Sequence, residues 1–274
     1  MNVFFSFLIF AVSSTVTSYQ PAANKTTETA GVEVQKAKVV RVDHYLGTIN
    51  NKYKISMVVE FTDGVVDGTY KYVTQKSGLI LNGTFDAGTK EFKIQERSQG
   101  STTATGFFEG KMEGDVLTGT WYDGKRTKSF PFSVTKQSKT IPEFSFMLEF
   151  EKDDGYDISK INVLDAKGTK LQELGDFESF VPEHIGLTLT LQDINFDGYP
   201  DLSLFQDQGA GANVMYNYWL YHPETKLFGR VMDFELWAFD TIDYVNQTLS
   251  LENYSAGKSE LMVFRFSGGH FVQQ

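Results

Sequence analysis

The chain contains no cysteine and has few prolines and histidines. Among its 274 residues there are 6 prolines and 4 histidines. Without cysteine the protein has no disulfide scaffold, no thiol nucleophile and no zinc site built on thiolates. Four histidines leave little material for a histidine-rich metal centre. Hydrophobic residues make up 41% of the chain, so it has enough apolar material for a sizeable core, and global disorder is not expected.

Positive charge is also scarce, and its shortage is confined to one half of the chain. Residues 1–144 hold 17 Lys+Arg against 14 Asp+Glu, whereas residues 145–274 hold 8 against 21, which gives +3 and −13. Phosphate binding requires clustered Lys and Arg, so the composition argues against nucleic acid and anionic membranes as partners. We expect a cation or a basic protein as the partner of the acidic half. A solvated acidic surface that favours solubility is the alternative.

The N-terminus has the pattern of a secretory signal peptide. An apolar run, Phe4–Val12, is too short to span a bilayer as a helix and is followed by small and polar residues. We expect a signal peptide over residues 1–18, a linker over 19–37, and a periplasmic or secreted protein without a membrane span once the signal is removed. A buried strand or an uncleaved anchor is the alternative, because no Lys or Arg precedes Phe4.

The first half repeats a short pattern of a polar residue, glycine, any residue and an aromatic residue. Glycines between successive strand-like stretches are typical of an antiparallel meander, and they allow one strand to pass close to another. We expect a β-domain over residues 38–137 in which the aromatic residues form the core, with ligand binding as the less favoured role. The four copies are 67–70, 82–85, 105–108 and 118–121.

The second half continues as alternating strand-like runs after a polar segment with a proline. We expect a linker over residues 138–144 and a C-terminal β-domain over residues 145–274, with a short helix within Leu171–Phe180. No segment keeps a 3.6-residue period over three turns. The predicted fold class is all-β, with antiparallel meander sheets arranged as a small β-propeller-like structure or as two tandem β-domains. The expected strands are 144–150, 158–164, 187–191, 216–221, 248–251 and 261–266.

One motif carries recognisable chemistry. Residues 193–202 read DINFDGYPDL, with oxygen-bearing side chains at positions 1, 3, 5 and 9 and glycine at position 6. Calcium takes six to eight oxygen ligands from such alternating residues on a tight loop. We expect calcium as the cofactor, with the Tyr199 carbonyl as a further ligand, and Ile194 and Phe196 pointing into the core. The candidate ligands are Asp193, Asn195, Asp197, Tyr199 and Asp201.

The loop is not an EF-hand, because position 12 is Leu204 where that motif needs a glutamate. Strand-like sequences flank it on both sides. We therefore expect the metal to have a structural role in stapling a hairpin. An Asx-rich turn without a metal is the alternative.

The sequence contains none of the common catalytic motifs, such as a Gly-x-Ser-x-Gly elbow, a His-Glu-x-x-His helix or a phosphate-binding glycine loop. We therefore expect a binding protein rather than an enzyme. Two glycine-rich loops are candidates for recognition, and a plain turn is the alternative for each. The candidate binding residues are Gly209, Gly211, Asn213 and Tyr216 in the first, and Ser267, Gly269 and His270 in the second.

The second half resembles exported bacterial proteins with FG-GAP/VCBS-like calcium loops. Three features carry the resemblance: the loop at 193–202, the Gly-Ala-Gly segment at 209–211, and the YWLYHPET strand at 218–225. Proteins of this kind resemble periplasmic lysozyme inhibitors and immunity proteins against peptidoglycan-hydrolase toxins. The resemblance implies a small propeller-like fold and inhibition by a loop that enters the cleft of the hydrolase. Ser267–Phe271 is the nearest match to the inhibitory Ser-Gly-x-x-Tyr loop of such inhibitors, with His270 and Phe271 where a tyrosine is expected.

The resemblance also implies a steric mechanism, in which an acidic binder is steered toward a basic lysozyme-like enzyme. A carbohydrate- or cell-surface-binding module is the alternative function. In that case Tyr216, Tyr218 and Trp219 would serve as stacking platforms for sugar rings.

Overall fold

The computed structural model describes residues 33–75, 77–151, 157–180, 188–208, 214–232, 238–255 and 258–274. Every regular element within these ranges is a β-strand, which confirms the all-β fold class. Hydrogen bonding between strands is antiparallel throughout, except for one parallel pair. The described residues include no helix with the length and hydrophobicity needed to cross a membrane. The predicted signal peptide at 1–18 and most of the predicted linker at 19–37 lie outside the described residues.

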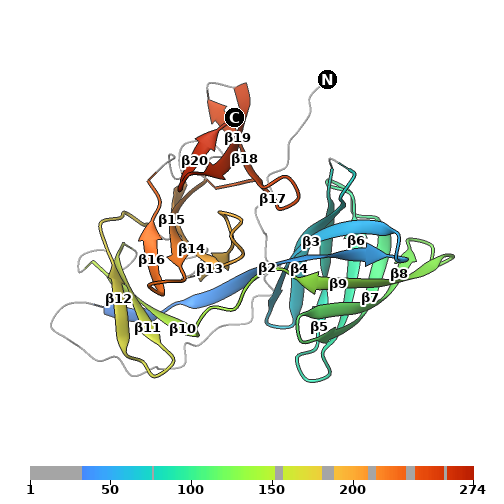
Figure 1. The fold of residues 1–274 in the computed structure, drawn as a ribbon, viewed down its shortest axis with the longest axis horizontal. Helices are drawn as coiled ribbons and strands as arrows, with labels where there is room; N and C mark the ends of the chain where they lie inside the picture. The colour runs from blue at the N-terminus through green and yellow to red at the C-terminus, as the bar shows by residue number, and fades with distance from the viewer. Residues whose placement is uncertain are drawn as a thin grey trace.

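Eight consecutive strands close into an antiparallel barrel (Figure 1). Each strand pairs with the next along the chain, and the last pairs with the first, where Tyr45–Ile49 of β2 lies against Phe132–Lys136 of β9. The strands are β2 (Lys38–Ile49), β3 (Tyr53–Thr62), β4 (Val65–Tyr72), β5 (Leu79–Phe85), β6 (Glu91–Arg97), β7 (Ala104–Glu113), β8 (Val116–Asp123) and β9 (Ser129–Lys136).

The barrel interior is filled by side chains, as expected for a barrel of eight strands. Its core includes Tyr70 and Phe108 from two of the repeated glycine motifs, both no more than 2% exposed. The predicted role of these aromatics in core packing is therefore confirmed. The other fully enclosed members include Ile55, Val66, Leu81 and Val134.

The repeated glycines allow neighbouring strands to approach closely. A Cβ on Gly68 would lie 2.2 Å from the Val58 carbonyl oxygen, and one on Gly119 would lie 2.1 Å from the Glu109 carbonyl oxygen. No side chain is compatible with such a distance, so only glycine fits where the strands curl. This confirms the interpretation that the glycine repeat marks close backbone contact.

The remaining strands form three antiparallel sheets, which follow one another along the chain (Figure 1). The first contains β1 (Glu33–Lys36), β10 (Phe144–Phe150), β11 (Ile158–Asp165) and β12 (Lys170–Leu174). The second contains β13 (Thr188–Gln192), β14 (Asp201–Gln208), β15 (Val214–His222) and β16 (Leu227–Arg230). The third contains β17 (Thr241–Asp243), β18 (Thr248–Ser255), β19 (Lys258–Ser267) and β20 (His270–Gln273).

Four-stranded antiparallel sheets are the units of β-propellers. Within the described residues, however, the strands that close into a ring are those of the barrel, through the pairing of β2 with β9. The barrel was not anticipated from the sequence. All six strand-like runs of the second half lie in observed strands wherever the structure describes them.

Strand β2 belongs to both the barrel and the second sheet. Residues Lys38–Arg41 pair in parallel with Thr188–Leu191 of β13, and the rest of β2 pairs with β3 within the barrel. Strand β1 immediately precedes it and pairs with β10 in the first sheet. Residues 33–36, at the end of the segment expected to be a linker, therefore form a strand that completes a sheet of the second half.

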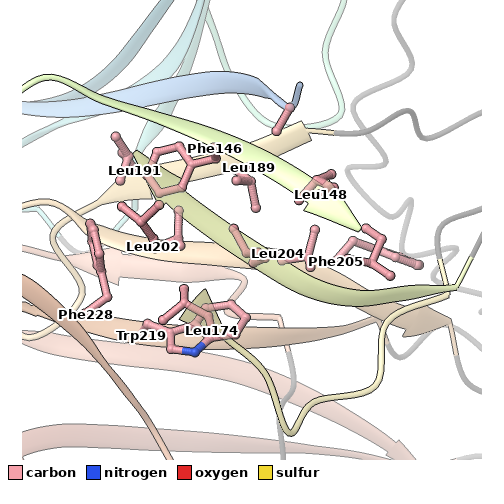
Figure 2. Packing of buried hydrophobic residues seen from close by; sticks show 14 of the residues in the cluster. Phe146, Leu148, Leu174, Leu189, Leu191, Leu202, Leu204, Phe205, Trp219 and Phe228 are labelled. Atoms are coloured by element: carbon pink, nitrogen blue, oxygen red, sulfur yellow. The ribbon is translucent and has the colours of Figure 1, made fainter. Parts of the chain in front are cut away.

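The first two sheets share an apolar core between them (Figure 2). Phe146 and Leu148 of β10 lie opposite Leu189, Leu202 and Leu204 of the second sheet, and each of these five side chains is 0% exposed. Trp219 of β15, 1% exposed, belongs to the same core. A separate cluster joins the outer face of β15 to the third sheet through Leu220, Leu249 and Phe264.

One secondary-structure prediction was wrong. Within Leu171–Phe180, where a short helix was expected, residues up to Leu174 belong to β12 and the rest form no helix. The backbone of β12 pairs with β11. The side-chain amide of Gln172 also bridges to β16, with Nε2 donating to the Phe228 carbonyl at 2.7 Å and Oε1 accepting from the Phe228 N–H at 2.9 Å. These bonds fix the segment as an extended strand.

Candidate metal centre

The predicted calcium loop joins β13 to β14 within an antiparallel hairpin. Gln192 and Asp201 pair at its base, so residues 193–200 form the connection. Ile194 is 3% exposed and lies in the core of the third sheet, against which Phe196 also packs. The expected anchoring of the loop by these two apolar residues is therefore confirmed. Gly198 has φ of 89°, a left-handed conformation that glycine adopts without strain.

Asp193 begins the loop, and one of its carboxylate oxygens has no hydrogen-bond donor among the described residues. Its Oδ2 accepts a hydrogen bond from the Gly198 N–H at 2.9 Å. Its Oδ1 is buried and has no hydrogen-bond partner among the described residues. A buried carboxylate oxygen without a donor is strongly unfavourable unless the group binds a cation or a proton.

Burial raises the pKa of Asp193 to about 6, and the negative charge of Asp197 adds to the effect. The Asp193 side chain therefore resists ionisation in this environment. A divalent cation next to Oδ1 would reverse that preference, because it stabilises the ionised form.

Asn195 and Asp197 shape the loop through short-range bonds. Asn195 Oδ1 accepts from the Asp197 N–H at 3.1 Å, and Asp197 Oδ1 accepts from the Tyr199 N–H at 2.7 Å. Asp197 is exposed, so its carboxylate lies at the solvent side of the loop. In both contacts a side-chain oxygen accepts a hydrogen bond from a backbone N–H two residues later. The short loop therefore carries several oxygen atoms, the type of ligand that calcium prefers.

Asp201 differs from the other aspartates of the loop. It is 2% exposed, and its two oxygens accept backbone hydrogen bonds from Ile194 and Tyr221, both at 2.9 Å. Burial raises the pKa of Asp201 well above its usual value. In this arrangement Asp201 ties the loop to β15, and each of its oxygens already accepts one backbone hydrogen bond.

The carboxylates of the loop do not converge on one point. Within the described ranges, no group of three or more His, Asp or Glu side chains is arranged to hold a metal ion. The buried carboxylate oxygen of the loop that lacks a donor is Oδ1 of Asp193.

Lys139 is a neighbour of the loop that the sequence did not reveal. Its backbone N–H donates to the Gly198 carbonyl at 2.7 Å, and its Nζ donates to the Asp197 carbonyl at 2.6 Å. The ammonium group also lies 4.3 Å from the centre of the Tyr199 ring. Lys139 comes from the segment between β9 and β10, 58 residues from Asp197, so no local pattern could place it there.

Tyr244 connects the loop to the barrel. Its hydroxyl donates to the Asp193 carbonyl at 2.7 Å, and its ring stacks on His44 of β2 with centroids 4.1 Å apart. A salt bridge of 2.5 Å between Lys71 of β4 and Asp243 joins the same two regions. The conformation of the loop is therefore coupled to the barrel wall.

The structure describes the second predicted recognition loop but only part of the first. Gly209, Gly211 and Asn213 lie outside the described residues. Tyr216 is half-buried in β15, packed between Phe205 and Tyr218.

Ser267 and His270 are paired across the β19–β20 hairpin. The two glycines between them both have positive φ, 62° and 88°, as a tight two-residue hairpin turn requires. Gly269 is therefore explained by turn geometry, and Ser267, Gly269 and His270 are exposed at this tip.

Two of the three aromatic side chains proposed as sugar-stacking platforms are buried, and the third, Tyr216, is half-buried. Tyr218 is 5% exposed and Trp219 is 1% exposed. Their rings pack within two different cores. A platform formed by Tyr218 and Trp219 is therefore excluded.

A second buried carboxylate, Glu96, lies inside the barrel, and its polar contacts are satisfied. It accepts hydrogen bonds from the Tyr70 hydroxyl, from Trp121 Nε1 at 3.1 Å and from Thr105 Oγ1 at 3.2 Å. A Cβ on Gly106 would lie 2.6 Å from Glu96 Oε1. Glu96 is thus enclosed by donors of the barrel and is not a second candidate site.

Comparison with protein-family models, curated proteins and solved structures finds no match for this chain. The FG-GAP/VCBS-like assignment stays a prediction. The function of the chain is therefore inferred from the site itself.

Proposed function

We propose that the loop at 193–200 binds calcium and that the chain is a non-catalytic binding protein stabilised by this metal. The buried, unpartnered Oδ1 of Asp193 carries this proposal. A cation would satisfy that oxygen and would neutralise the repulsion between Asp193 and Asp197. Asp193, Asn195, Asp197 and the Tyr199 carbonyl would hold the ion, and its chemistry would be structural.

Calcium should raise the melting temperature of the purified protein. A ligand present at one hundred times its dissociation constant stabilises the folded state by about 2.7 kcal/mol. For a protein of this size that corresponds to roughly 5–10 °C. The Asp197→Ala variant should lose the gain, whereas Asp63→Ala, which changes an exposed aspartate of the barrel, should retain it. Titration calorimetry that detects no heat on adding calcium to chelator-treated protein would reject the proposal.

We further propose that the partner is a basic protein and that it is a lysozyme-like peptidoglycan hydrolase met outside the cytoplasm. The charge of −13 carried by residues 145–274 supports a basic partner. Long-range attraction of this sign accelerates association and weakens with added salt. The resemblance to exported inhibitors supports the hydrolase. Inhibition would be steric, with a loop of this chain blocking the cleft.

This part of the proposal is tested by turbidity assays of peptidoglycan lysis. Purified protein should protect peptidoglycan against at least one muramidase or amidase encoded beside its gene, and the protection should weaken as salt is raised. Full lysis by every such enzyme at a molar excess of this protein would contradict the inhibitor function. That result would leave the calcium proposal unaffected, because the two are measured separately.

A further inference from the structure

An open pocket away from the loop at 193–200 is a second candidate binding site. Its volume is about 490 Å³, within the range of pockets that hold small molecules or a few residues of a peptide. It lies where the segment after β12 meets β14 and the end of β16. The lining side chains are Asp176, Phe177, Glu178, Gln206, Arg230 and Met232.

The walls of this pocket are held by hydrogen bonds from neighbouring strands. Ser179 Oγ donates to the Phe205 carbonyl at 2.6 Å, and the Phe180 N–H donates to the Gln206 carbonyl at 2.8 Å. Asn217, which is 0% exposed, donates from Nδ2 to the Glu178 carbonyl at 2.7 Å. The segment that carries Asp176, Phe177 and Glu178 is therefore fixed in place before any ligand arrives.

Two of the lining residues each carry a buried polar atom that the described part of the protein does not satisfy. Gln206 Oε1 and Arg230 Nε are both buried, and neither has a hydrogen-bond partner among the described residues. The Arg230 guanidinium makes one bond there, from Nη2 to Asn217 Oδ1 at 3.2 Å. Buried polar atoms are normally paired. A ligand that accepts and donates at once would pair both, provided that the side chains of Gln206 and Arg230 turn toward it.

The other residues that line the pocket are two acidic and two apolar side chains. Asp176 and Glu178 are exposed and form no salt bridge within the described part of the chain. Met232 is 74% exposed, the largest exposure among the large hydrophobic side chains described. Phe177 forms the wall between them and packs edge-on against Trp219, with centroids 5.3 Å apart.

We propose that this pocket binds a lysine- or arginine-containing segment of the basic partner. With the side chains of Gln206 and Arg230 turned toward the ligand, a peptide group of that segment would accept from Arg230 Nε and donate to Gln206 Oε1. Its basic side chain would meet Asp176 and Glu178, and the aliphatic stem would cover Phe177 and Met232. The inference rests on the proposed function, because it names the surface that engages the partner.

Other classes of ligand would leave some of the polar or charged groups of the pocket without a partner. The two carboxylates oppose a simple anion, and an apolar ligand leaves Gln206 Oε1 and Arg230 Nε unsatisfied. A neutral sugar could satisfy Gln206 and Arg230 but would make no use of the charges of Asp176 and Glu178.

Short capped peptides provide a direct test. The probes are acetyl-Ala-Lys-Ala-amide and its norleucine and glutamate counterparts, together with N-acetylglucosamine as the neutral sugar. Binding to the full chain is followed by NMR through the indole signal of Trp219, which contacts Phe177. The lysine peptide should bind at least fivefold more tightly than the norleucine peptide, and the glutamate peptide should not bind. Tighter binding of the sugar or of the glutamate peptide would overturn the proposal.

Variants separate recognition from folding. Gln206→Met should weaken binding of the lysine peptide at least fivefold. It should not lower the melting temperature, because Gln206 Oε1 has no hydrogen-bond partner among the described residues of the free protein. The double variant Asp176→Asn, Glu178→Gln should remove the preference for lysine over norleucine. Gln95→Met, on the exposed side of β6, is the matched control and should bind the peptide as the parent does. Unchanged binding by Gln206→Met would contradict the proposal.

The same variants separate this inference from the proposed function. If a hydrolase is inhibited and the double variant inhibits equally well, the pocket is not the docking site but the function stands. If the lysine peptide binds in the pocket and no hydrolase is inhibited, the pocket stands and the hydrolase is wrong.

Discussion

Two aspartates of one loop have opposite surroundings, although the sequence presents them as equivalent ligands. Asp193 keeps a buried oxygen without a partner, whereas both oxygens of Asp201 accept backbone hydrogen bonds. The first therefore gains from a cation, and the second already stabilises the fold. Their amide variants should behave differently.

Asp193→Asn should abolish the gain in melting temperature on adding calcium, and without calcium it should be as stable as the parent or more so, because it removes a buried charge. Asp201→Asn should lower the free energy of unfolding by about 1–3 kcal/mol, since its amide group cannot accept both backbone N–H bonds. It should keep most of the calcium gain. Thermal unfolding with and without calcium measures both effects, and loss of the calcium gain only in Asp201→Asn would contradict this assignment.

His44 should make the protein sensitive to acid. Burial lowers its pKa from 6.5 to about 4, partly offset by the negative charge of Asp243, and the side chain is 6% exposed. The unfolded chain therefore binds this proton more readily than the folded protein does. The free energy of unfolding should fall as the pH drops from 6.5 towards 4, with a total loss of about 3 kcal/mol below both values.

The measurement is denaturant unfolding at several pH values, compared with His44→Phe. Phenylalanine keeps a ring against Tyr244 but cannot take up a proton. The variant should lose less stability than the parent across this pH window. Equal slopes for the two proteins would show that other groups govern acid unfolding.

At the scale of strands, alternation and glycine spacing predicted most of what the structure contains. The strand at Phe144–Phe150 was located to the residue, because its side chains alternate between buried and half-buried. The short helix expected within Leu171–Phe180 was wrong, because the first residues of this segment belong to strand β12. In the structure Leu174 and Phe177 pack inward, whereas Leu171 and Phe180 are exposed.

The glycine repeat yields a direct test of barrel geometry. Gly119→Ala should lower the free energy of unfolding by about 2–3 kcal/mol, because its Cβ would lie 2.1 Å from a backbone oxygen. Gly175→Ala is the matched control, since a Cβ there would meet nothing within 4 Å. It should be neutral or stabilising by up to about 1 kcal/mol. Equal losses in chemical denaturation would show that the strands can separate to admit the methyl group.

At the scale of the whole molecule, the loop at 193–200 could be located from the sequence and the pocket could not. The loop is a local motif, so its candidate ligands lie within nine residues. The pocket takes its lining from three separate segments, at 176–178, at Gln206 and at 230–232. Closure of the barrel could not be predicted for the same reason. It depends on the pairing of Tyr45 with Lys136, which are far apart in the sequence and which no short pattern relates.

The shared strand β2 makes the second half dependent on the first. Residues 33–41 supply β1 and the paired part of β2 to the first and second sheets. A fragment of residues 138–274 should therefore expose two strand edges and fail to unfold cooperatively. The fragment should regain a cooperative transition on adding a peptide of residues 33–42, followed by circular dichroism. Cooperative unfolding of the fragment alone would contradict this dependence.

The parallel pair of β2 and β13 also sets an order of events on the ribosome. Lys38 pairs with Thr188, 150 residues later in the chain. At translation rates of about 5–20 residues per second, the nascent chain waits roughly 8–30 s before this partner is made. During that interval the barrel strands can already meet one another, while the first residues of β2 remain open to other chains. We therefore expect aggregation in the cell to begin from the incomplete chain, in which this strand edge is unpaired, rather than from the folded protein.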